Sequence, residues 1–187
     1  MQNIGILALQ GDFDKHRQAV EKLGQKAVLV KDVEKLSDCD RLIIPGGEST
    51  TFLHLVEKLQ LRQGLIDFIE KKPVFGTCAG LILLSKSAEK LPFPPLGVID
   101  IIAKRNAYGR QVDSFVDDIR LNLNGRESVF EGVFIRAPKI KDFGKKVNAL
   151  AWHNNDVVMA ESGKILVAAF HPELTDDLSI HQYFIEK

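Results

Sequence analysis

The sequence predicts an α/β fold with three layers, in which helices cover both faces of a mainly parallel central sheet. Three observations lead to this fold class. Short apolar runs alternate with helical segments in the first half of the chain, as is typical of strands buried on both faces. Glycine-rich breaks follow several of these runs. In the second half, strand-like runs succeed one another at short turns, which indicates antiparallel additions to the sheet.

Composition indicates a single globular domain over residues 1–187. The chain is 45% hydrophobic and 27% charged, and its 187 residues can bury a sizeable core. Acidic and basic side chains balance at 25 each, so no net field favours nucleic acid as a partner. No apolar run is long enough to cross a bilayer, and the first residues lack the pattern of a signal peptide. We therefore expect no membrane partner.

Cysteine usage indicates the cellular setting. The two cysteines, Cys39 and Cys78, make a poor disulfide framework, which favours a reducing, cytoplasmic environment. The sequence has no Cys/His spacing typical of a zinc site. We expect neither a bound metal nor a cofactor.

The elements of the first half follow from the alternation of apolar runs and amphipathic segments. Strands are expected at residues 4–9, 27–30, 41–44 and in the apolar run before residue 76. Helices are expected up to residue 23, over 33–37, from about 49 to 59, and over 62–71. Their caps are predicted to be Asp12 or Asp14 for the first helix and Ser49 or Thr50 for the third. Ligands of such sheets lie at the carboxyl ends of the strands, where the loops 10–12, 46–49 and 76–80 are expected to meet.

The second half begins after a rigid, proline-rich loop at 91–95. Strand-like runs are expected around residues 98–102, 114–121, 132–135, 147–151, 156–160 and 165–170. The turn 122–125 is typical of an antiparallel connection, and a helix is expected over 178–185. The sequence contains no internal repeat or linker that would divide the domain.

The sequence Gly76-Thr77-Cys78-Ala79-Gly80 is the first candidate for chemistry. It lies between an apolar strand and the start of a helix, where a nucleophile held at a sharp turn needs small flanking residues. A thiol at a helix N-terminus is favoured as the thiolate, the form that attacks. On this motif alone, an ordinary buried cysteine in a glycine-flanked turn is an equally good interpretation.

The sequence His171-Pro172-Glu173 offers the general base that a cysteine nucleophile needs. Of the five histidines, His16 and His54 are expected in amphipathic helices as surface residues. His171 instead closes the strand ending at residue 170, at the same edge of the sheet as Cys78. Pro172 is expected to keep the backbone extended, so that His171 and Glu173 project to one side and form a hydrogen bond. The alternative is that Glu173 stabilises the start of the last helix.

An acyl-transfer nucleophile also needs donors for the developing oxyanion. One is expected to be the N–H of Ala79, which follows the nucleophile. The second is expected from the neighbouring Gly46-Gly47 loop, whose glycines let the backbone approach a ligand closely. No Lys-Ser/Thr ending follows this loop, so it is a poor phosphate-binding loop.

These residues carry a resemblance to the class I glutamine amidotransferases, and within them to the glutaminase subunits of pyridoxal 5′-phosphate synthases. The resemblance runs from end to end and implies a flavodoxin-like fold. It is carried by Leu-Gln-Gly-Asp at 9–12, Pro-Gly-Gly-Glu-Ser-Thr-Thr at 45–51, Gly-Thr-Cys-Ala-Gly at 76–80, Arg-Asn-Ala-Tyr-Gly-Arg-Gln at 105–111, Phe-Ile-Arg-Ala-Pro at 134–138, and His-Pro-Glu-Leu-Thr at 171–175.

The resemblance implies a role for each site residue. Cys78 would form a glutamyl thioester, His171 would act as acid and base, and Glu173 would orient His171. The residues implied around the bound L-glutamine are Gly47, Glu48, Ser49, Arg105, Ile135 and Arg136. A guanidinium fork and acidic or carbonyl acceptors suit an α-carboxylate and an α-ammonium. Spacing alone leaves Arg105 and Arg136 equally compatible with surface charge, and Gln10 and Asp12 are expected at the rim, near a partner surface.

The resemblance further implies hydrolysis of L-glutamine to glutamate and ammonia, with the ammonia passed directly to a pyridoxal 5′-phosphate synthase subunit in a hetero-oligomer. Docking of that subunit would complete the oxyanion hole by reorienting the Gly46–Gly47 peptide. Other interpretations are the glutaminase of imidazole glycerol phosphate synthesis, a cysteine peptidase or deglycase of the same fold, a partner-free amide hydrolase, and a non-catalytic binding module. The stretch at 105–111 disfavours the first, and the complete triad disfavours the last.

Overall fold

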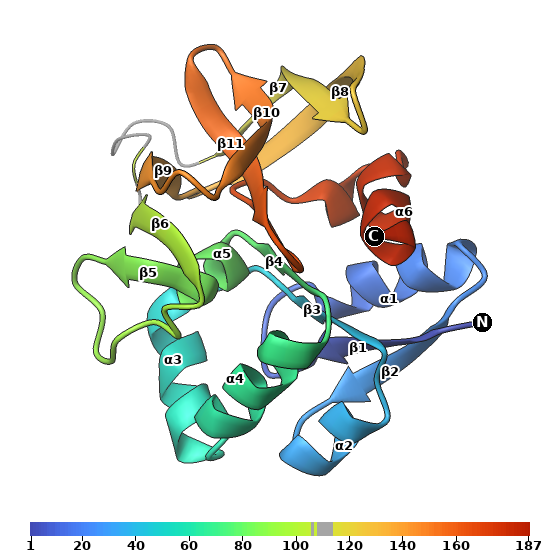
Figure 1. The fold of residues 1–187 in the computed structure, drawn as a ribbon, viewed down its shortest axis with the longest axis vertical. Helices are drawn as coiled ribbons and strands as arrows, with labels where there is room; N and C mark the ends of the chain where they lie inside the picture. Colours follow the sequence, from blue (N-terminus) through green and yellow to red (C-terminus); the bar gives the residue numbers. More distant parts are fainter. Residues whose placement is uncertain (106, 108–113) are drawn as a thin grey trace.

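The computed structural model describes residues 1–105, 107 and 114–187, and Figure 1 shows their arrangement. Its main sheet has the strand order β2-β1-β3-β4-β12-β11-β10-β7-β8. The first five strands are parallel: β2 (Lys26–Val30), β1 (Asn3–Leu7), β3 (Arg41–Ile44), β4 (Val74–Thr77) and β12 (Ile165–Ala168). The antiparallel part consists of β11 (Asp156–Ser162), β10 (Asn148–His153), β7 (Ser114–Leu123) and β8 (Arg126–Ile135).

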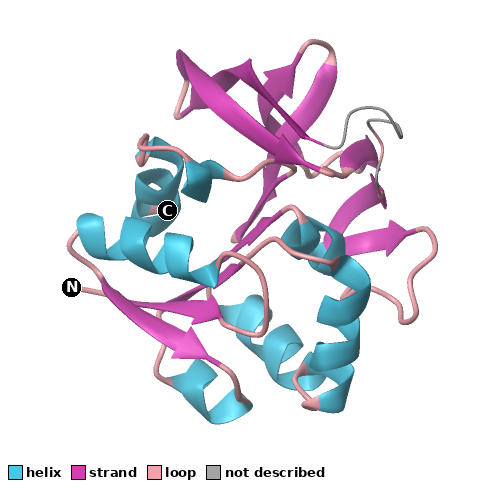
Figure 2. Cartoon of the chain, turned by 180° about the vertical axis from the view of Figure 1, so that it is seen from behind, coloured by secondary structure: helices cyan, strands magenta, loops and turns pink. Residues whose placement is uncertain are grey.

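Helices lie on both faces of the parallel strands (Figures 1 and 2). One face carries α1 (Phe13–Lys22) and α6 (Ser179–Glu186); the other carries α2 (Val33–Ser37), α3 (Ser49–Lys58), α4 (Arg62–Lys71) and α5 (Ala79–Leu84). A small sheet of β5 (Ser85–Ala88), β6 (Ile99–Lys104) and β9 (Lys139–Phe143) lies next to α5. The predicted α/β class, a mainly parallel sheet with antiparallel additions between helices, is confirmed.

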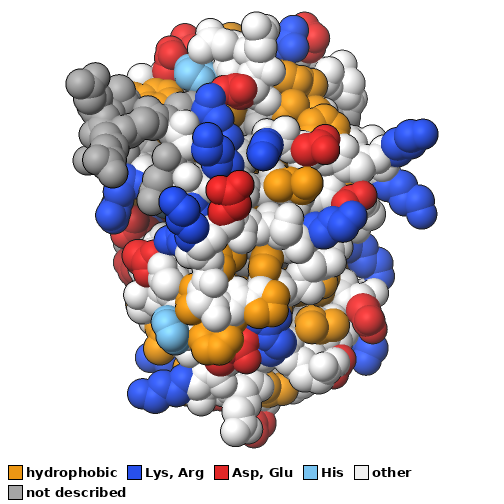
Figure 3. Space-filling model, turned by 90° about the vertical axis from the view of Figure 1, so that its left-hand side faces the viewer, with side chains coloured by type: hydrophobic (Ala, Val, Ile, Leu, Met, Phe, Trp, Pro, Cys, Tyr) orange, Lys and Arg blue, Asp and Glu red, His pale blue; other side chains and the backbone are white. Residues whose placement is uncertain are grey.

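Burial explains why apolar runs mark the central strands. Every residue of β4 and β12 is buried, because these strands lie inside the sheet and are covered on both faces. The edge strand β2 has only its last residue buried, and β6 alternates buried and exposed residues because one of its faces meets solvent. On the face shown in Figure 3, basic and acidic side chains are interspersed.

Several elements differ from the sequence-based expectation. The strands β5 and β9 were not predicted, because their sequences are short and rich in lysine, serine and aspartate. The strand β8 is ten residues long and begins well before residue 132. The sequence does not predict its first half, because those residues are largely polar and mostly exposed. The strands expected over 4–9 and 165–170 end early, at Leu7 and Ala168.

The predicted caps are also corrected. The N-cap of α3 is Glu48, not Ser49 or Thr50, because its carboxylate accepts hydrogen bonds from the backbone N–H groups of Thr50 at 3.1 Å and Thr51 at 2.7 Å. Asp12 occupies the N-cap position of α1, but its side chain makes no capping hydrogen bond. The side chain of Asp12 is therefore left to face the end of the sheet.

The topology sends the helices that follow β1 and β3 to opposite faces of the sheet. The chain leaves β1 for α1 on one face and leaves the neighbouring β3 for α3 on the other, and the two loops remain in contact through a 2.7 Å hydrogen bond from Gln10 Nε2 to the carbonyl of Glu48. The strand β12 brings the C-terminal part of the chain to the same edge, since Ala168 pairs with Thr77, the residue before Cys78. Among the described residues, none of the helices is both long and apolar enough for a membrane span.

Candidate active site

A cavity of about 240 Å³ opens where the carboxyl ends of β1, β3 and β4 meet the end of β8. It is small compared with the roughly 300–1,000 Å³ of sites for drug-sized ligands, and so suits a small metabolite. Asp12 lines it, together with eight of the residues expected at the site: Gly47, Glu48, Ser49, Cys78, Arg105, Ile135, Arg136 and His171. The three loops after β1, β3 and β4 therefore meet, as the sequence predicted.

Cys78 occupies a sharp turn between β4 and α5. Its φ of 48° and ψ of −101° are unusual for a residue with a side chain, and such strain concentrates at functional positions. The turn is held by a 2.8 Å hydrogen bond from the Cys78 N–H to the carbonyl of Ala168. It also needs Gly80, because a Cβ there would lie 2.2 Å from the carbonyl oxygen of Ile44. The Sγ of Cys78 lies at the cavity, 3.9 Å from the carbonyl oxygen of Ile135.

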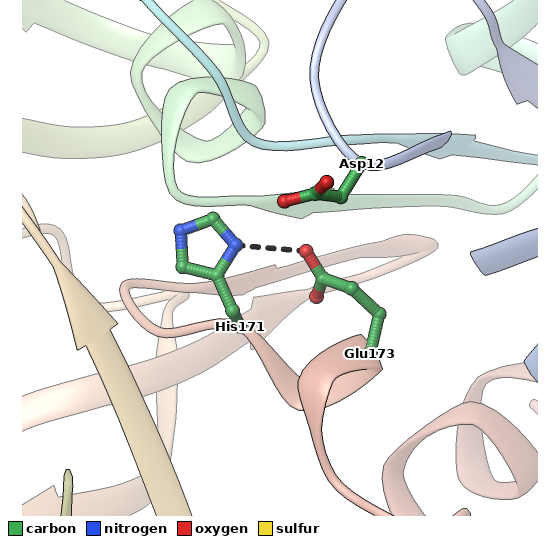
Figure 4. A group of neighbouring side chains, drawn as sticks. All are labelled: Asp12, His171 and Glu173. Carbon is green, nitrogen blue, oxygen red and sulfur yellow. Dashed lines mark hydrogen bonds and ion pairs between the residues drawn. The ribbon is translucent and has the colours of Figure 1, made fainter. Parts of the chain in front are cut away.

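His171 and Glu173 form a buried hydrogen bond. His171 Nδ1 lies 2.8 Å from Glu173 Oε1, and both residues are 5% exposed. Figure 4 shows the second ring nitrogen of His171 pointing away from Glu173. The backbone N–H of His171 donates to the carbonyl of Val133 at 2.8 Å, which fixes the backbone of His171 to β8. This arrangement orients the imidazole and keeps a proton on Nδ1, whether or not Nε2 is also protonated.

The local backbone differs from the predicted extended segment. Pro172–Leu174 is a 3-10 turn, so a tight turn, not an extended strand, brings the two side chains together. The alternative role of Glu173, as a stabiliser of the last helix, is wrong, because α6 begins at Ser179.

The side chains of His171 and Cys78 both pack against the backbone of Gly46. A Cβ on Gly46 would lie 2.4 Å from Cε1 of His171 and 3.2 Å from Cβ of Cys78. Both side chains thus pack against the same bare backbone position, which explains why the loop after β3 needs glycine there. Gly47, the next residue, has a φ of 140°, which residues with a side chain rarely adopt.

The proton on His171 is stabilised by its surroundings. Burial opposes the imidazolium, but the hydrogen bonds and negative charges of Cys78 and Glu173 outweigh it and raise the pKa of His171 to about 10. Burial likewise opposes the carboxylate of Glu173, yet the charges and hydrogen bonds of His16 and His171 hold its pKa below the ordinary value. His171 is therefore protonated near neutral pH and able to deliver a proton to a leaving group.

Glu48 and Arg105 form the polar wall of the cavity. Hydrogen bonds from Thr50 and Thr51 outweigh partial burial and lower the pKa of Glu48 to about 2. Arg105 reaches Glu48 Oε1 at 3.2 Å and also donates to the carbonyl of Lys90 at 2.6 Å. Glu48 is therefore a fixed negative charge at the cavity.

Arg136 is the second guanidinium at the cavity. It follows β8 with a φ of 43° and is exposed. In the described part of the chain, it has neither a hydrogen-bond partner nor an ion-pair partner for its side chain. This guanidinium can receive an anionic group of a ligand without breaking an existing contact.

The carboxylate of Asp12 lies close to the imidazole. One ligand-type atom from each of Asp12, His171 and Glu173 falls within 4.8 Å of the others. Figure 4 shows the three side chains next to one another. These donor types occur in metal sites, but the hydrogen bond between His171 and Glu173 already uses two of them. Asp12 is thus an acidic group at the cavity, as its expected place at the rim implies.

Ala79 is the first residue of α5 and is buried; as a first-turn residue, its N–H has no partner within the helix. The distinctive stretch at 105–111 falls largely on residues 106 and 108–113, which lie outside the described residues.

His16 is buried where the sequence predicts a surface residue. Of the two histidines expected on the surface, His54 is exposed, whereas His16 is fully buried behind Glu173. The signal was present in the helical spacing, because His16, Ala19 and Val20 recur at i, i+3 and i+4 and form the buried face of α1.

The chain is similar over nearly its full length to known glutamine amidotransferases. The model of the SNO glutamine amidotransferase family matches residues 6–187. A pyridoxal 5′-phosphate synthase subunit PdxT of Thermosipho africanus is 48% identical over 183 residues, covering 97% of this chain and 96% of that protein. The PdxT subunit of Oenococcus oeni is 47% identical over 183 residues, covering 98% of this chain and 95% of that protein. A crystal structure described as a glutamine amidotransferase superposes with a TM-score of 0.91 at 42% identity, covering 98% of this chain and 97% of the other.

Proposed function

The chain belongs to the SNO glutamine amidotransferase family, and we propose that Cys78, His171 and Glu173 are the triad with which it releases ammonia from L-glutamine. The chain is a glutaminase that hydrolyses L-glutamine to L-glutamate and ammonia for pyridoxal 5′-phosphate synthesis. The observation that carries the triad is the buried His171–Glu173 hydrogen bond, packed with Cys78 against Gly46 at one cavity.

The chemistry follows from the protonation of the site. The Cys78 thiolate attacks the side-chain amide carbon of glutamine, and the carbonyl becomes an oxyanion. We assign its donors to the backbone N–H groups of Ala79 and Gly47. His171 gives its proton to the amide nitrogen, so the C–N bond breaks and ammonia leaves a glutamyl thioester. His171 then takes a proton from water, whose hydroxide attacks the thioester and releases glutamate and Cys78.

The polar groups of the cavity match the two charges of an α-amino acid. We assign the α-carboxylate to Arg136, because this guanidinium lines the cavity without a partner among the described residues. The α-ammonium is assigned to the acceptors nearby, the carboxylate of Glu48 and the carbonyl of Ile135. In this proposal Arg105 holds Glu48 in place, and Ser49 lies at the start of α3 beside the ligand.

Loss of the Arg136 charge is therefore expected to weaken glutamine binding. For Arg136→Ala we expect the KM for L-glutamine to rise roughly 10- to 100-fold, as for the loss of a charge-assisted hydrogen bond, with a smaller change in kcat. Steady-state kinetics of ammonia release measures both. The control is Arg126→Ala, which removes an exposed guanidinium at the start of β8, away from the cavity. Equal KM changes in the two variants would refute the assignment.

The partner is a pyridoxal 5′-phosphate synthase subunit, and we propose that the two form a hetero-oligomer in the cytoplasm. Free ammonia is mostly protonated near neutral pH and would be lost to solvent, which favours its direct transfer. We further propose that docking reorients the Gly46–Gly47 peptide and completes the oxyanion hole. The glycine at each position makes such a rotation sterically possible. In this proposal residues 1–187 act as one glutamine amidotransferase domain that binds neither nucleic acid nor a membrane.

An isotope experiment tests this function. The purified protein is combined with a synthase subunit, its sugar phosphate substrates, glutamine labelled with nitrogen-15 in the amide, and unlabelled ammonium. We expect the product to carry more label than the ammonium pool, and ammonia release to rise strongly with the synthase present. Label diluted to the level of the pool would refute direct transfer. Full activity without the synthase would instead indicate a partner-free amide hydrolase.

A further inference from the structure

Two buried histidines lie behind the triad, on the side of Glu173 away from the cavity. His16 comes from α1 and His181 from α6, and both side chains are 0% exposed. His16 Nε2 lies 3.4 Å from Glu173 Oε2 and 3.3 Å from the hydroxyl of Thr77, and His16 Nδ1 lies 3.0 Å from His181 Nε2. The chain of contacts thus runs inward from Glu173 to His16 and then to His181.

The neighbours of His16 determine which of its nitrogens carries a proton. Glu173 is ionised and can only accept, so the nitrogen that faces it, Nε2, must be the N–H. His181 is neutral, because burial and the adjacent His16 lower its pKa to about 3, and its Nε2 lies 3.0 Å from His16 Nδ1, where either nitrogen can carry the shared proton. The contact with His181 thus leaves His16 Nε2 free to present an N–H towards Glu173.

The second oxygen of Glu173 depends on this contact. Oε1 receives the hydrogen bond of His171, whereas Oε2 is buried without a hydrogen-bond partner in the described chain and has only His16 at ion-pair distance. A carboxylate held at one oxygen can rotate about its last bond and carry Oε1 away from His171. The contact of His16 Nε2 with Oε2 opposes that rotation. It also contacts Thr77, the residue before Cys78, and so links Glu173 to the strand that carries the nucleophile.

We propose that His16 is a positioning residue for the hydrolysis of glutamine: its Nε2–H fixes the carboxylate of Glu173 so that Oε1 stays aimed at His171. The inference rests on the proposed triad. It does not require His16 to touch the substrate, because His16 is not among the residues that line the cavity.

The test compares variants that keep or remove the N–H facing Glu173. His16→Met removes it, and we expect kcat for ammonia release, measured in the complex with the synthase, to fall roughly 10- to 100-fold with KM unchanged. His16→Gln carries an amide N–H near the position of Nε2 and should restore most of kcat. The matched control is His181→Met, which replaces a histidine buried to the same extent that contacts His16 but not Glu173, and it should keep kcat.

Specific outcomes would overturn the proposal. Equal losses in His16→Met and His181→Met would mean that both histidines only fill the interior, as would an unchanged kcat in a folded His16→Met protein. Should His16→Met fail to fold, His16→Asn replaces it, since its shorter amide aligns with Nδ1 and cannot reach Glu173.

A second measurement separates this proposal from the proposed function. The proton resonance of the His171 Nδ1–H, which bonds Glu173, should shift in His16→Met and stay in place in His16→Gln and His181→Met. This shift can be observed in a protein without glutaminase activity. An inactive wild type would therefore refute the proposed function and leave the positioning role of His16 to be decided by the resonance. An unshifted resonance in His16→Met would refute the positioning role.

Discussion

Replacing Cys78 with alanine is expected to lower ammonia release from L-glutamine by about 10⁴-fold or more, to the level left by binding and the oxyanion donors alone. The reason is chemical: no thioester can form without the sulfur, and direct attack by water lacks a positioned nucleophile. The fold should persist, because alanine removes one atom and adopts the same backbone. We expect the free energy of unfolding to change by about 1 kcal/mol, which urea titration measures.

Cys39 supplies the matched control for this experiment. It is also fully buried, but it lies away from the cavity, and burial with the nearby Asp38 raises the pKa of its thiol to about 11. Its thiol is therefore protonated and unreactive near neutral pH. Cys39→Ala should keep full activity, and an electrophilic glutamine analogue should label Cys78 alone, as detected by mass spectrometry. Persistent activity in Cys78→Ala would mean that a different group is the nucleophile.

The parallel half of the fold could be predicted because each of its strands is a short apolar run with a clear boundary. Its central strands β4 and β12 are buried on both faces, so nearly every residue carries the signal. The loops that follow them hold the site, and their order along the chain placed Cys78 and His171 at one edge. The sequence therefore predicts that the motif residues lie at one edge of the sheet, even though no side-chain contact can be read from it.

The rest depended on contacts that a linear sequence does not contain. The small strands β5 and β9 are defined by their pairing with β6, not by their own polar sequences. The carboxylate of Glu48 caps α3 from a position usually given to shorter side chains, because Thr50 and Thr51 offer both N–H and hydroxyl groups to it. The burial of His16 follows from the packing of α6 over α1, since His181 covers it, and α6 is 165 residues away in sequence at that contact.

The amide variant Glu173→Gln is expected to lower kcat by roughly 10²- to 10⁴-fold, because an amide can offer its N–H₂ group to His171 and leave the imidazole in the wrong tautomer. It should also destabilise the protein in a pH-dependent manner. His171 has its pKa raised from 6.5 to about 10, so its contribution to stability is fully present below about pH 6.5 and is lost as the pH rises through about 10. Glu173 has its pKa lowered from 4.5, so its contribution is present above about pH 4.5 and is lost as the pH falls further.

The difference in unfolding free energy between wild type and Glu173→Gln should therefore be largest between about pH 4.5 and 6.5, at about 3–5 kcal/mol, as for a broken buried ion pair. It should shrink steadily towards pH 10, where the wild-type imidazole also loses its proton. Urea titrations at a series of pH values measure this curve, with Glu131→Gln, an exposed carboxylate on β8, as the control without pH dependence. A difference that stayed constant from pH 5 to pH 10 would mean that Glu173 acts through packing, and that the buried charge pair does not hold the proton on His171.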